Sequence, residues 1–260
     1  MKELKRYLDS RKGNFSFYFE DLKDGYIYGF NDLVKMPCAG CIKLPVAMAL
    51  FKEIENNKFS LDTNIRIGKD DIEEGVSGII HEFKEKEYTL LELLIAMLIQ
   101  SDNTAANKII DLITKERINE IFLDMGLNNT KLVRKTSDKL STNDKGENYS
   151  TSFELSKCYK ILYESSYLNK EHSERILKIL RRQQRRNKIP FYISKKEWCN
   201  IANKAGRLDG IEADSALLTV SKGDFIFTVM SSELPNNVYG ITTIARISKM
   251  MWDIVNMNWK

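Results

Sequence analysis

The chain has 260 residues, 43% of them hydrophobic, with 40 basic and 36 acidic residues and a formal net charge of +4. This length is sufficient for a sizeable core in one domain or in two interleaved domains. The net charge is too small to indicate a class of binding partner. No run of about 20 apolar residues occurs, so we expect no membrane span. Four cysteines in a chain of this size exclude a small disulfide-stapled scaffold.

The start of the chain predicts a helix, a hairpin and a second helix. Residues 1–13 form a charged amphipathic helix and not a signal peptide. The protein is therefore expected in the cytoplasm if this sequence is full length, and secreted if a leader was removed. Residues 15–22 and 26–31 predict two strands around a Lys-Asp-Gly turn. Residues 42–54 have apolar positions at helical spacing, and Pro45 is tolerated in the first turn.

In the middle of the chain, helices are the only regular secondary structure that the sequence predicts. Residues 60–88 are mixed and rich in loops, and 128–148 form a polar loop. Thr89 and Glu92 make a capping box that opens a helix ending at Gln100. Further helices are predicted over 104–114, 115–125, 151–164 and 170–184, the third opened by a capping box from Thr151 to Glu154.

One basic run, RRQQRR at 181–186, stands at the end of the last of these helices. Cations are favourable at a helix C-terminus. The run is therefore interpreted as a solvated helix end in preference to a nucleic-acid patch, and we expect no nucleic-acid partner.

The last part of the chain predicts strands over 200–208, 213–222 and 223–234, and a closing helix over 242–257. Strands at both ends of the chain predict one antiparallel sheet flanked by N- and C-terminal helices, an α+β fold with an inserted all-α lobe. The expected lobes are a discontinuous sheet lobe, a helical lobe and an active-site cleft between them. Their boundaries are 1–36 and 190–260 for the sheet lobe and 37–189 for the helical lobe.

Three short motifs follow one another along the chain: Gly-Cys-Ile-Lys at 40–43, Ser-Asp-Asn at 101–103 and Lys-Ala-Gly at 204–206. They lie in the stretches IKLPVAMAL, SDNTAANKIID and KAGRLDGIEADSALL. In these stretches the chain resembles class A β-lactamases and penicillin-binding proteins, which carry Ser-x-x-Lys, Ser-Asp-Asn and Lys-Thr-Gly in that order. The similarity runs over nearly the whole chain and implies the β-lactamase/transpeptidase fold.

The resemblance also implies roles for individual residues. In this family a serine at a helix N-terminus attacks the β-lactam carbonyl, and the acyl-enzyme is then hydrolysed. Here Gly40 occupies the nucleophile position. Lys43, one helical turn later, corresponds to the lysine that helps to deprotonate the nucleophile. Ser101 corresponds to the serine that relays a proton to the leaving nitrogen, and Asn103 to the asparagine that holds the substrate amide.

The third motif implies the rest of the site. Lys204 corresponds to the lysine that attracts the substrate carboxylate. Ala205 and Gly206 belong to the strand that lines the site and supplies a backbone N–H to the oxyanion hole. The implied ligand is a β-lactam or a D-Ala-D-Ala-like small molecule. We expect no cofactor and a monomer.

Three positions depart from the family pattern. Gly40 cannot be acylated, and Ala205 lacks the threonine hydroxyl. Lys135 stands where a class A enzyme needs the glutamate that activates the deacylating water, and Asp138 is three residues away, a large displacement for a general base. Together the losses favour natural degeneration over one laboratory Ser→Gly change. The retained polar residues either satisfy one another in a dead site or still bind a carboxylate-bearing, peptide-like ligand.

The cysteines offer a different chemistry. Cys38 and Cys41 form a C-x-x-C pair, which could serve as redox pair or acyl-transfer thiols. Cys41 is one residue past the serine position, a rotation of about 100° on a helix, and is expected to be a packed, inert thiol, whereas Cys38 could face the cleft. His81 and His172, the only histidines, lack ligand-like spacing to a cysteine, so no metal site is predicted.

Overall fold

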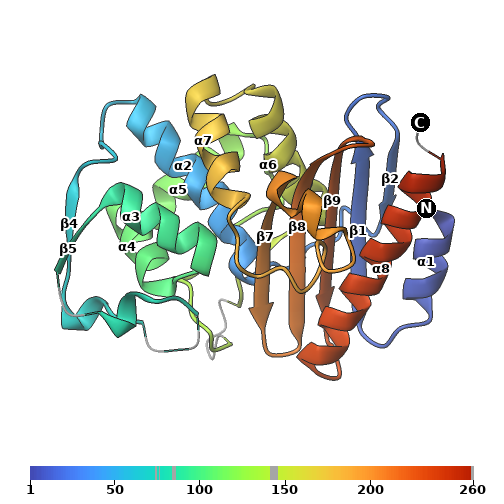
Figure 1. Cartoon of the computed structure of the whole chain (residues 1–260). Coiled ribbons are helices and arrows are strands. Elements are labelled where there is room, and N and C mark those ends of the chain that lie inside the picture. The colour runs from blue at the N-terminus through green and yellow to red at the C-terminus, as the bar shows by residue number, and fades with distance from the viewer. Residues whose placement is uncertain (74, 76, 84–85, 141–145, 259–260) are drawn as a thin grey trace.

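The computed structural model describes residues 1–73, 75, 77–83, 86–140 and 146–258. Its central element is a five-stranded antiparallel sheet in the order β2-β1-β9-β8-β7. The strands are β1 (Asn14–Asp21), β2 (Ile27–Phe30), β7 (Ile201–Leu208), β8 (Ile211–Val220) and β9 (Gly223–Ser232). Strand β1 pairs with β9, so both ends of the chain build one sheet, as predicted (Figure 1).

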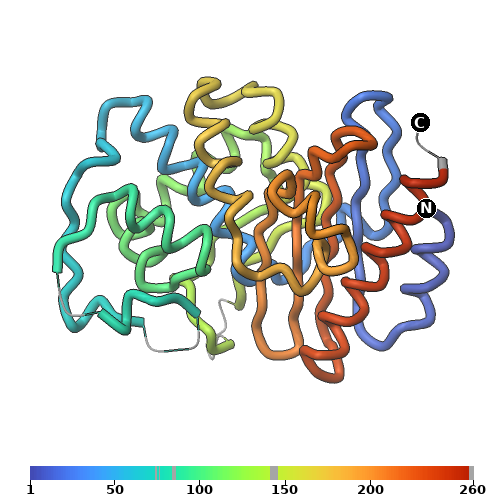
Figure 2. The backbone as a smooth tube through the Cα atoms, viewed as in Figure 1, coloured from blue at the N-terminus to red at the C-terminus, as the bar shows by residue number. Residues whose placement is uncertain are grey.

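Helices cover both faces of this sheet. Helices α1 (Lys2–Asp9) and α8 (Asn237–Asn258) lie against one face, and both ends of the chain lie on this side of the molecule (Figure 2). Helix α6 (Ser152–Glu164) packs against the other face. Successive strand residues alternate between the faces. Thus Leu217 joins the core shared with the middle helices and Leu218 the core shared with α1 and α8.

The helical part of the molecule is built around α2 (Lys43–Glu55), which is buried on nearly all sides from Lys43 to Phe51. A helix that is apolar all round belongs in a core, and Figure 1 shows α2 passing between the other helices towards β7. The surrounding helices are α3 (Leu90–Ile95), α4 (Asn103–Ile113), α5 (Lys115–Asp124) and α7 (Lys170–Leu180). A π-helical turn, η4 (Ala96–Gln100), follows α3, and 3-10 turns lie at η1 (Ala39–Ile42), η2 (Lys69–Asp71), η3 (Ile80–Glu82) and η5 (Lys195–Asn200).

The expectation of a purely helical middle is wrong in detail. Strand β4 (Asn64–Ile67) pairs with β5 (Lys86–Thr89), and β3 (Met36–Pro37) pairs with β6 (Tyr149–Ser150). These strands have two to four residues, too few for a periodic signal in the sequence. The closing helix also begins at Asn237, five residues before the predicted start.

The basic run is not a solvated helix end, because α7 ends at Leu180. Gln183 turns inward and donates from Nε2 to Leu98 O at 2.7 Å. Arg185 Nη2 donates to Ser77 Oγ at 2.8 Å, and Arg186 Nη1 donates to Ile201 O at 2.9 Å. These side chains satisfy oxygens of the neighbouring segments, so the chain leaves the helix to follow β7.

The first predicted capping box is confirmed, and the second is half formed. Thr89 and Glu92 each accept a hydrogen bond from the backbone N–H of the other. Thr151 accepts from Glu154 N at 3.0 Å, but the Glu154 carboxylate accepts instead from Asn129 N at 2.8 Å and Thr130 Oγ1 at 2.6 Å. Glu154 therefore anchors the loop after α5. In the part of the chain that the structure describes, no helix is long and apolar enough to cross a membrane.

Candidate active site

Position 40 faces the centre of the candidate site. Gly40 lies in η1, immediately before α2, and a Cβ placed on it would lie 3.1 Å from Ser101 Oγ and 3.2 Å from Ala205 O. Those contacts are tight, and a Cβ would require its neighbours to shift by a few tenths of an ångström. By contrast, a Cβ on Gly206 would lie 2.7 Å from Cys38 O and 2.8 Å from Gly40 N. Only glycine lets β7 pass so close to η1, whereas Gly40 is not required by space.

The polar residues predicted from the three motifs lie together around Ser101. Lys43 Nζ donates to Ser101 O and to Asn103 Oδ1, each at 2.6 Å, and lies 3.4 Å from Ser101 Oγ. Lys204 Nζ donates to Ser101 Oγ and to Ala205 O, each at 2.9 Å. All four side chains in this network are buried. Ser101 Oγ therefore lies between two amines.

Burial controls the protonation of both lysines. No carboxylate of the described residues forms an ion pair with either amine. Burial, with a smaller contribution from the positive charge of Arg185, lowers the pKa of Lys43 to about 7. Burial, followed by the charge of Lys43, lowers the pKa of Lys204 well below its ordinary value. A neutral amine, able to accept a proton, is therefore available near neutral pH.

The local fold explains why Ser101 and Asn103 face this network. The π-helical turn η4 ends at Ser101, whose backbone is left-handed, with φ +58°. The next residue, Asp102, caps α4 by accepting from Ala105 N at 2.8 Å. Its carboxylate also accepts from Ile79 N at 2.6 Å. The middle residue of the motif is thus structural, and its two neighbours turn towards the site.

The position expected to carry the deacylating glutamate holds Lys135, but the carboxylate of Asp138 contacts the polar network. Lys135, more than half exposed, points away and pairs with Asp111 at 2.7 Å. Asp138 accepts from Asn103 Nδ2 at 3.1 Å through Oδ1 and from Ser77 N at 2.8 Å through Oδ2. The sequence analysis placed Asp138 three residues from the deacylation position and did not predict its contact with Asn103. Spacing along a loop carries no information on how the loop folds back.

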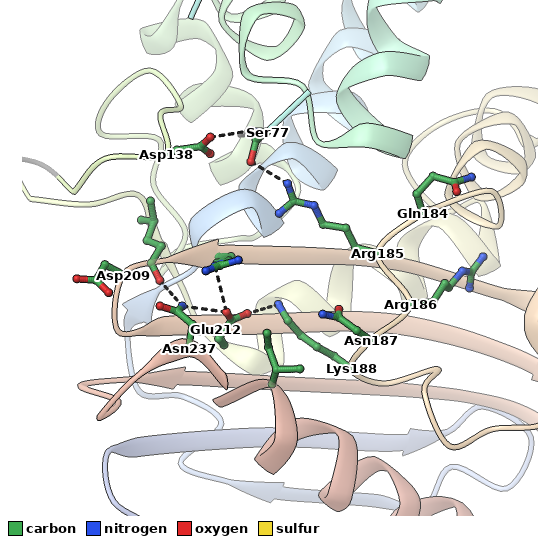
Figure 3. A pocket seen from close by; sticks show the side chains of 13 residues that line it. Ser77, Asp138, Gln184, Arg185, Arg186, Asn187, Lys188, Asp209, Glu212 and Asn237 are labelled. Carbon is green, nitrogen blue, oxygen red and sulfur yellow. Dashed lines mark hydrogen bonds and ion pairs between the residues drawn. The ribbon is translucent and has the colours of Figure 1, made fainter. Parts of the chain in front are cut away.

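Two connected spaces adjoin these residues. An inner cavity of about 20 Å³, enough for one water molecule, is lined by Gly40, Lys43 and Ser101 among others. An open pocket of about 650 Å³ lies beside it. Figure 3 shows Ser77 linked to both Asp138 and Arg185 on one side of this pocket. The residues shared by both spaces are Ser77, Asp138, Arg185, Arg207 and Leu208.

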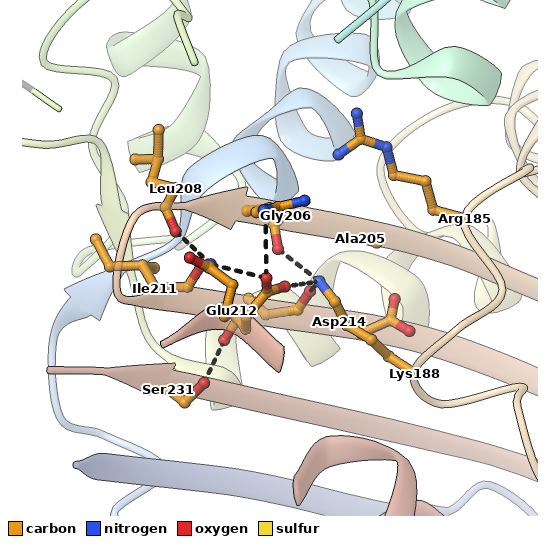
Figure 4. Close-up of polar contacts among 12 residues, drawn as sticks. Arg185, Lys188, Ala205, Gly206, Leu208, Ile211, Glu212, Asp214 and Ser231 are labelled. Carbon is orange, nitrogen blue, oxygen red and sulfur yellow. Dashed lines mark hydrogen bonds and ion pairs between the residues drawn. The ribbon is translucent and has the colours of Figure 1, made fainter. Parts of the chain in front are cut away.

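The opposite side of the pocket holds a buried ion pair that the sequence analysis missed (Figure 4). Lys188 Nζ lies 2.5 Å from Glu212 Oε2 and donates to Gly206 O at 2.6 Å and Ala213 O at 2.9 Å. Glu212 Oε1 accepts from Asn237 Nδ2 at 2.9 Å. Both charged side chains are almost completely buried. The pair joins β7, β8 and the start of α8, and its only sequence signal was an acidic residue in a predominantly apolar strand that also contains Asp214.

The thiols of the C-x-x-C pair are buried, so the expectation that Cys38 could face the cleft is wrong. Cys38 Sγ lies 3.3 Å from Asn148 O, and Cys41 Sγ lies 3.1 Å from Lys204 O. Burial raises the pKa of Cys41 to about 12 and that of Cys38 well above its ordinary value. A thiol with a raised pKa is a poor nucleophile. Within the described residues, no group of three or more His, Cys, Asp and Glu side chains is placed to hold a metal ion.

The burial of these thiols predicts their reactivity. Iodoacetamide at neutral pH should label the exposed Cys199 first and leave Cys38, Cys41 and Cys158 unlabelled until the protein unfolds. Peptide mapping after a short exposure distinguishes the four sites. Rapid labelling of Cys38 or Cys41 in the folded protein would instead support a cysteine-based acyl transferase.

Comparison with known proteins places this geometry in context. The chain matches the family described as Beta-lactamase enzyme family over residues 1–255. A β-lactamase from Sphaerobacter thermophilus is 22% identical, with a TM-score of 0.91 over 98% of this chain and 96% of that chain. PBP-A is 23% identical, with a TM-score of 0.89 over 98% and 95%. A variant of PBP-A, solved as an acyl-enzyme complex with penicillin G, is 22% identical with a TM-score of 0.88 over the same shares. The predicted fold class is confirmed.

Proposed function

We propose that this chain, which belongs to the β-lactamase enzyme family, binds a carboxylate-bearing, peptide-like ligand and does not hydrolyse it through residue 40. The ligand class comprises β-lactams and D-Ala-D-Ala peptides. One observation carries the proposal. Lys43 and Lys204 converge on Ser101 Oγ, which lies 3.1 Å from where the Cβ of residue 40 would lie, and that residue is Gly40.

Charge supports recognition of an anionic ligand. Lys204 is buried without an ion pair among the described residues, and Arg185 donates there only to the neutral Ser77 Oγ. A ligand carboxylate would give Lys204 and Arg185 a directly bonded anion, whereas Asp138 and Glu212 act on Arg185 only through their charge. Charge-assisted hydrogen bonds of this kind are stronger than neutral ones. Asn103 lies beside them with an amide able to pair with a peptide-like group.

The same residues explain why hydrolysis is not expected. Without a side chain at position 40 no acyl-serine forms there, and no carboxylate occupies position 135. Asp138 is committed to Asn103 and Ser77. Family turnover needs a nucleophile for the first step and a general base within hydrogen-bond reach of water for the second. This site supplies neither in the family's positions.

Binding requires the two spaces to merge. The inner cavity of about 20 Å³ is far smaller than the several hundred Å³ that a drug-sized ligand occupies. The neighbouring pocket of about 650 Å³ is large enough. The Ser77–Arg185 hydrogen bond lies where the two spaces share residues, so we expect a ligand carboxylate to take Arg185 from Ser77.

Thermal unfolding tests the proposed binding. Benzylpenicillin or a D-Ala-D-Ala peptide at about 100 times its Kd should raise the Tm by about 5–10 °C. Lys204→Ala should abolish the rise, because it removes the buried amine that donates to Ser101 Oγ and that we propose to bind the ligand carboxylate. Lys135→Ala, a change at an exposed lysine outside the site, should leave it intact. The proposal fails if neither ligand shifts the Tm at millimolar concentration, or if the shift persists in Lys204→Ala.

A further inference from the structure

We infer that Ser101 takes over as the nucleophile of this cleft, and that a bound β-lactam is captured as a lasting ester on Ser101 Oγ. The inference rests on the ligand binding proposed above and adds a covalent step to it. Its product is a stoichiometric adduct and not turnover.

The first argument is space. Ser101 Oγ lies 3.1 Å from the Cβ position of residue 40, one hydrogen-bond length from the side chain that is missing. Because residue 40 is glycine, no side chain lies between it and Ser101 Oγ, and both residues line the inner cavity of about 20 Å³. A ligand carbonyl can therefore approach Ser101 through the space that a serine at position 40 would occupy.

The second argument is the pair of amines. A neutral Lys43 has two N–H groups and one lone pair. Ser101 O and Asn103 Oδ1 accept hydrogen bonds from these two N–H groups, each at 2.6 Å from Nζ. The lone pair is then left for the hydroxyl proton of Ser101, whose Oγ lies 3.4 Å from Nζ. Lys204 Nζ, at 2.9 Å, donates to the same Oγ. The hydroxyl thus has one amine placed to accept its proton and a second amine that donates a hydrogen bond to its oxygen, the arrangement of a Ser–Lys dyad.

The third argument is rigidity. A non-glycine residue at φ +58° is held in a sparsely populated backbone conformation, and such strain clusters at functional sites. Here the surroundings fix it. Lys43 binds Ser101 O, while Asp102 N donates to Ala96 O at 3.1 Å and the Asp102 carboxylate is bound by three backbone N–H groups. The hydroxyl of Ser101 is therefore placed before any ligand arrives.

The covalent step balances without a further reactant. The Ser101 hydroxyl proton passes to Lys43 Nζ, Oγ forms a bond with the lactam carbonyl carbon, and the lactam C–N bond breaks. The Lys43 ammonium returns its proton to the released nitrogen. Every ligand atom stays on the protein. Lys135 is on the surface and Asp138 is held by Asn103 and Ser77, so among the described residues no carboxylate is free at the family's deacylation position to activate water, and we expect the ester to persist.

Intact mass spectrometry after incubation with benzylpenicillin tests this inference. The protein should gain the mass of one drug molecule, and trypsin should place the adduct on residues 87–108, which contain Ser101, and not on 36–43. Ser101→Ala should gain no mass, while Ser166→Ala, at an exposed serine, should react like the unaltered protein. The rate should rise with pH through about 7, because Lys43 accepts a proton only in its neutral form.

The outcomes separate this inference from the proposed function. No added mass together with a ligand-induced rise in Tm overturns the Ser101 inference and leaves ligand binding standing. Neither mass nor rise in Tm overturns both. An adduct on 36–43, where Cys38 and Cys41 lie, or an adduct that survives Ser101→Ala, also overturns it. Mapping of the unaltered protein decides the site even if Ser101→Ala does not fold.

Discussion

Gly40→Ser should make the protein form an acyl adduct with penicillin at least about 100-fold faster than the natural chain. The new Cβ would point at Ser101 Oγ and Ala205 O at 3.1 and 3.2 Å, so shifts of a few tenths of an ångström accommodate it. Its hydroxyl would join the network of Lys43 and Lys204. The adduct should then map to residues 36–43 instead of 87–108. Rapid-quench intact mass spectrometry measures the rate.

Gly40→Ala is the matched control for that change. This variant adds a Cβ without a hydroxyl, so it should form no adduct at position 40. It should also slow the reaction at Ser101, because the added methyl group occupies the space through which a ligand would approach Ser101 Oγ. Gly40→Ser should remain acylated, because the deacylation position is still Lys135. Absence of any adduct in Gly40→Ser would show that the retained network is not competent for acyl transfer, and the interpretation of position 40 would be wrong.

Glu212→Ala should lower the free energy of unfolding by about 3–5 kcal/mol. The change leaves the Lys188 ammonium buried with only carbonyl partners, and it removes one of the acceptors of Asn237, which also donates to Leu208 O at 2.7 Å. Breaking one side of a buried pair is costly because a charge is left uncompensated. Urea unfolding at neutral pH gives the difference.

Two controls accompany this variant. Glu233→Ala, at an exposed carboxylate close by in the sequence, should change stability by no more than about 0.5 kcal/mol. The double change Lys188→Met with Glu212→Leu should recover most of the loss, since an apolar pair of similar volume avoids the unpaired charge. A Glu212→Ala protein within 1 kcal/mol of the natural chain would show that the pair contributes little.

Local patterns in the sequence were sufficient to predict much of the fold. The strands around the Lys-Asp-Gly turn and the late strands predicted a sheet built from both chain ends, and the apolar spacing after Lys43 predicted the buried helix α2. The short strands β4 and β5 were not predicted, because four residues are too few to show a periodic pattern. The end of α7 was placed too late because the inward turn of Gln183 depends on Leu98, a long-range contact.

Only some of the residues of the candidate site could be predicted from the sequence. The order of three motifs identified Lys43, Ser101 and Lys204, which the structure brings together, although the sequence could not give their distances or their burial. Arg185 and the Lys188–Glu212 pair were not anticipated, since each depends on how separate segments fold against β7 and β8.

Family membership by itself predicts β-lactam hydrolysis, whereas the residues at positions 40 and 135 predict none. These expectations differ in a single readily measured quantity, which is catalytic turnover. Stoichiometric capture by Ser101 would not alter it, because an adduct that persists consumes one ligand per chain.

Nitrocefin hydrolysis, compared between the natural chain and Lys43→Ala, is therefore the most direct test. Lys43 is the residue that we propose as the base of this site, so the variant sets the level of hydrolysis without catalysis by this site. We predict equal rates for both proteins at the background level. Turnover by the natural chain well above that of Lys43→Ala would contradict the proposal that this member of the family no longer hydrolyses β-lactams.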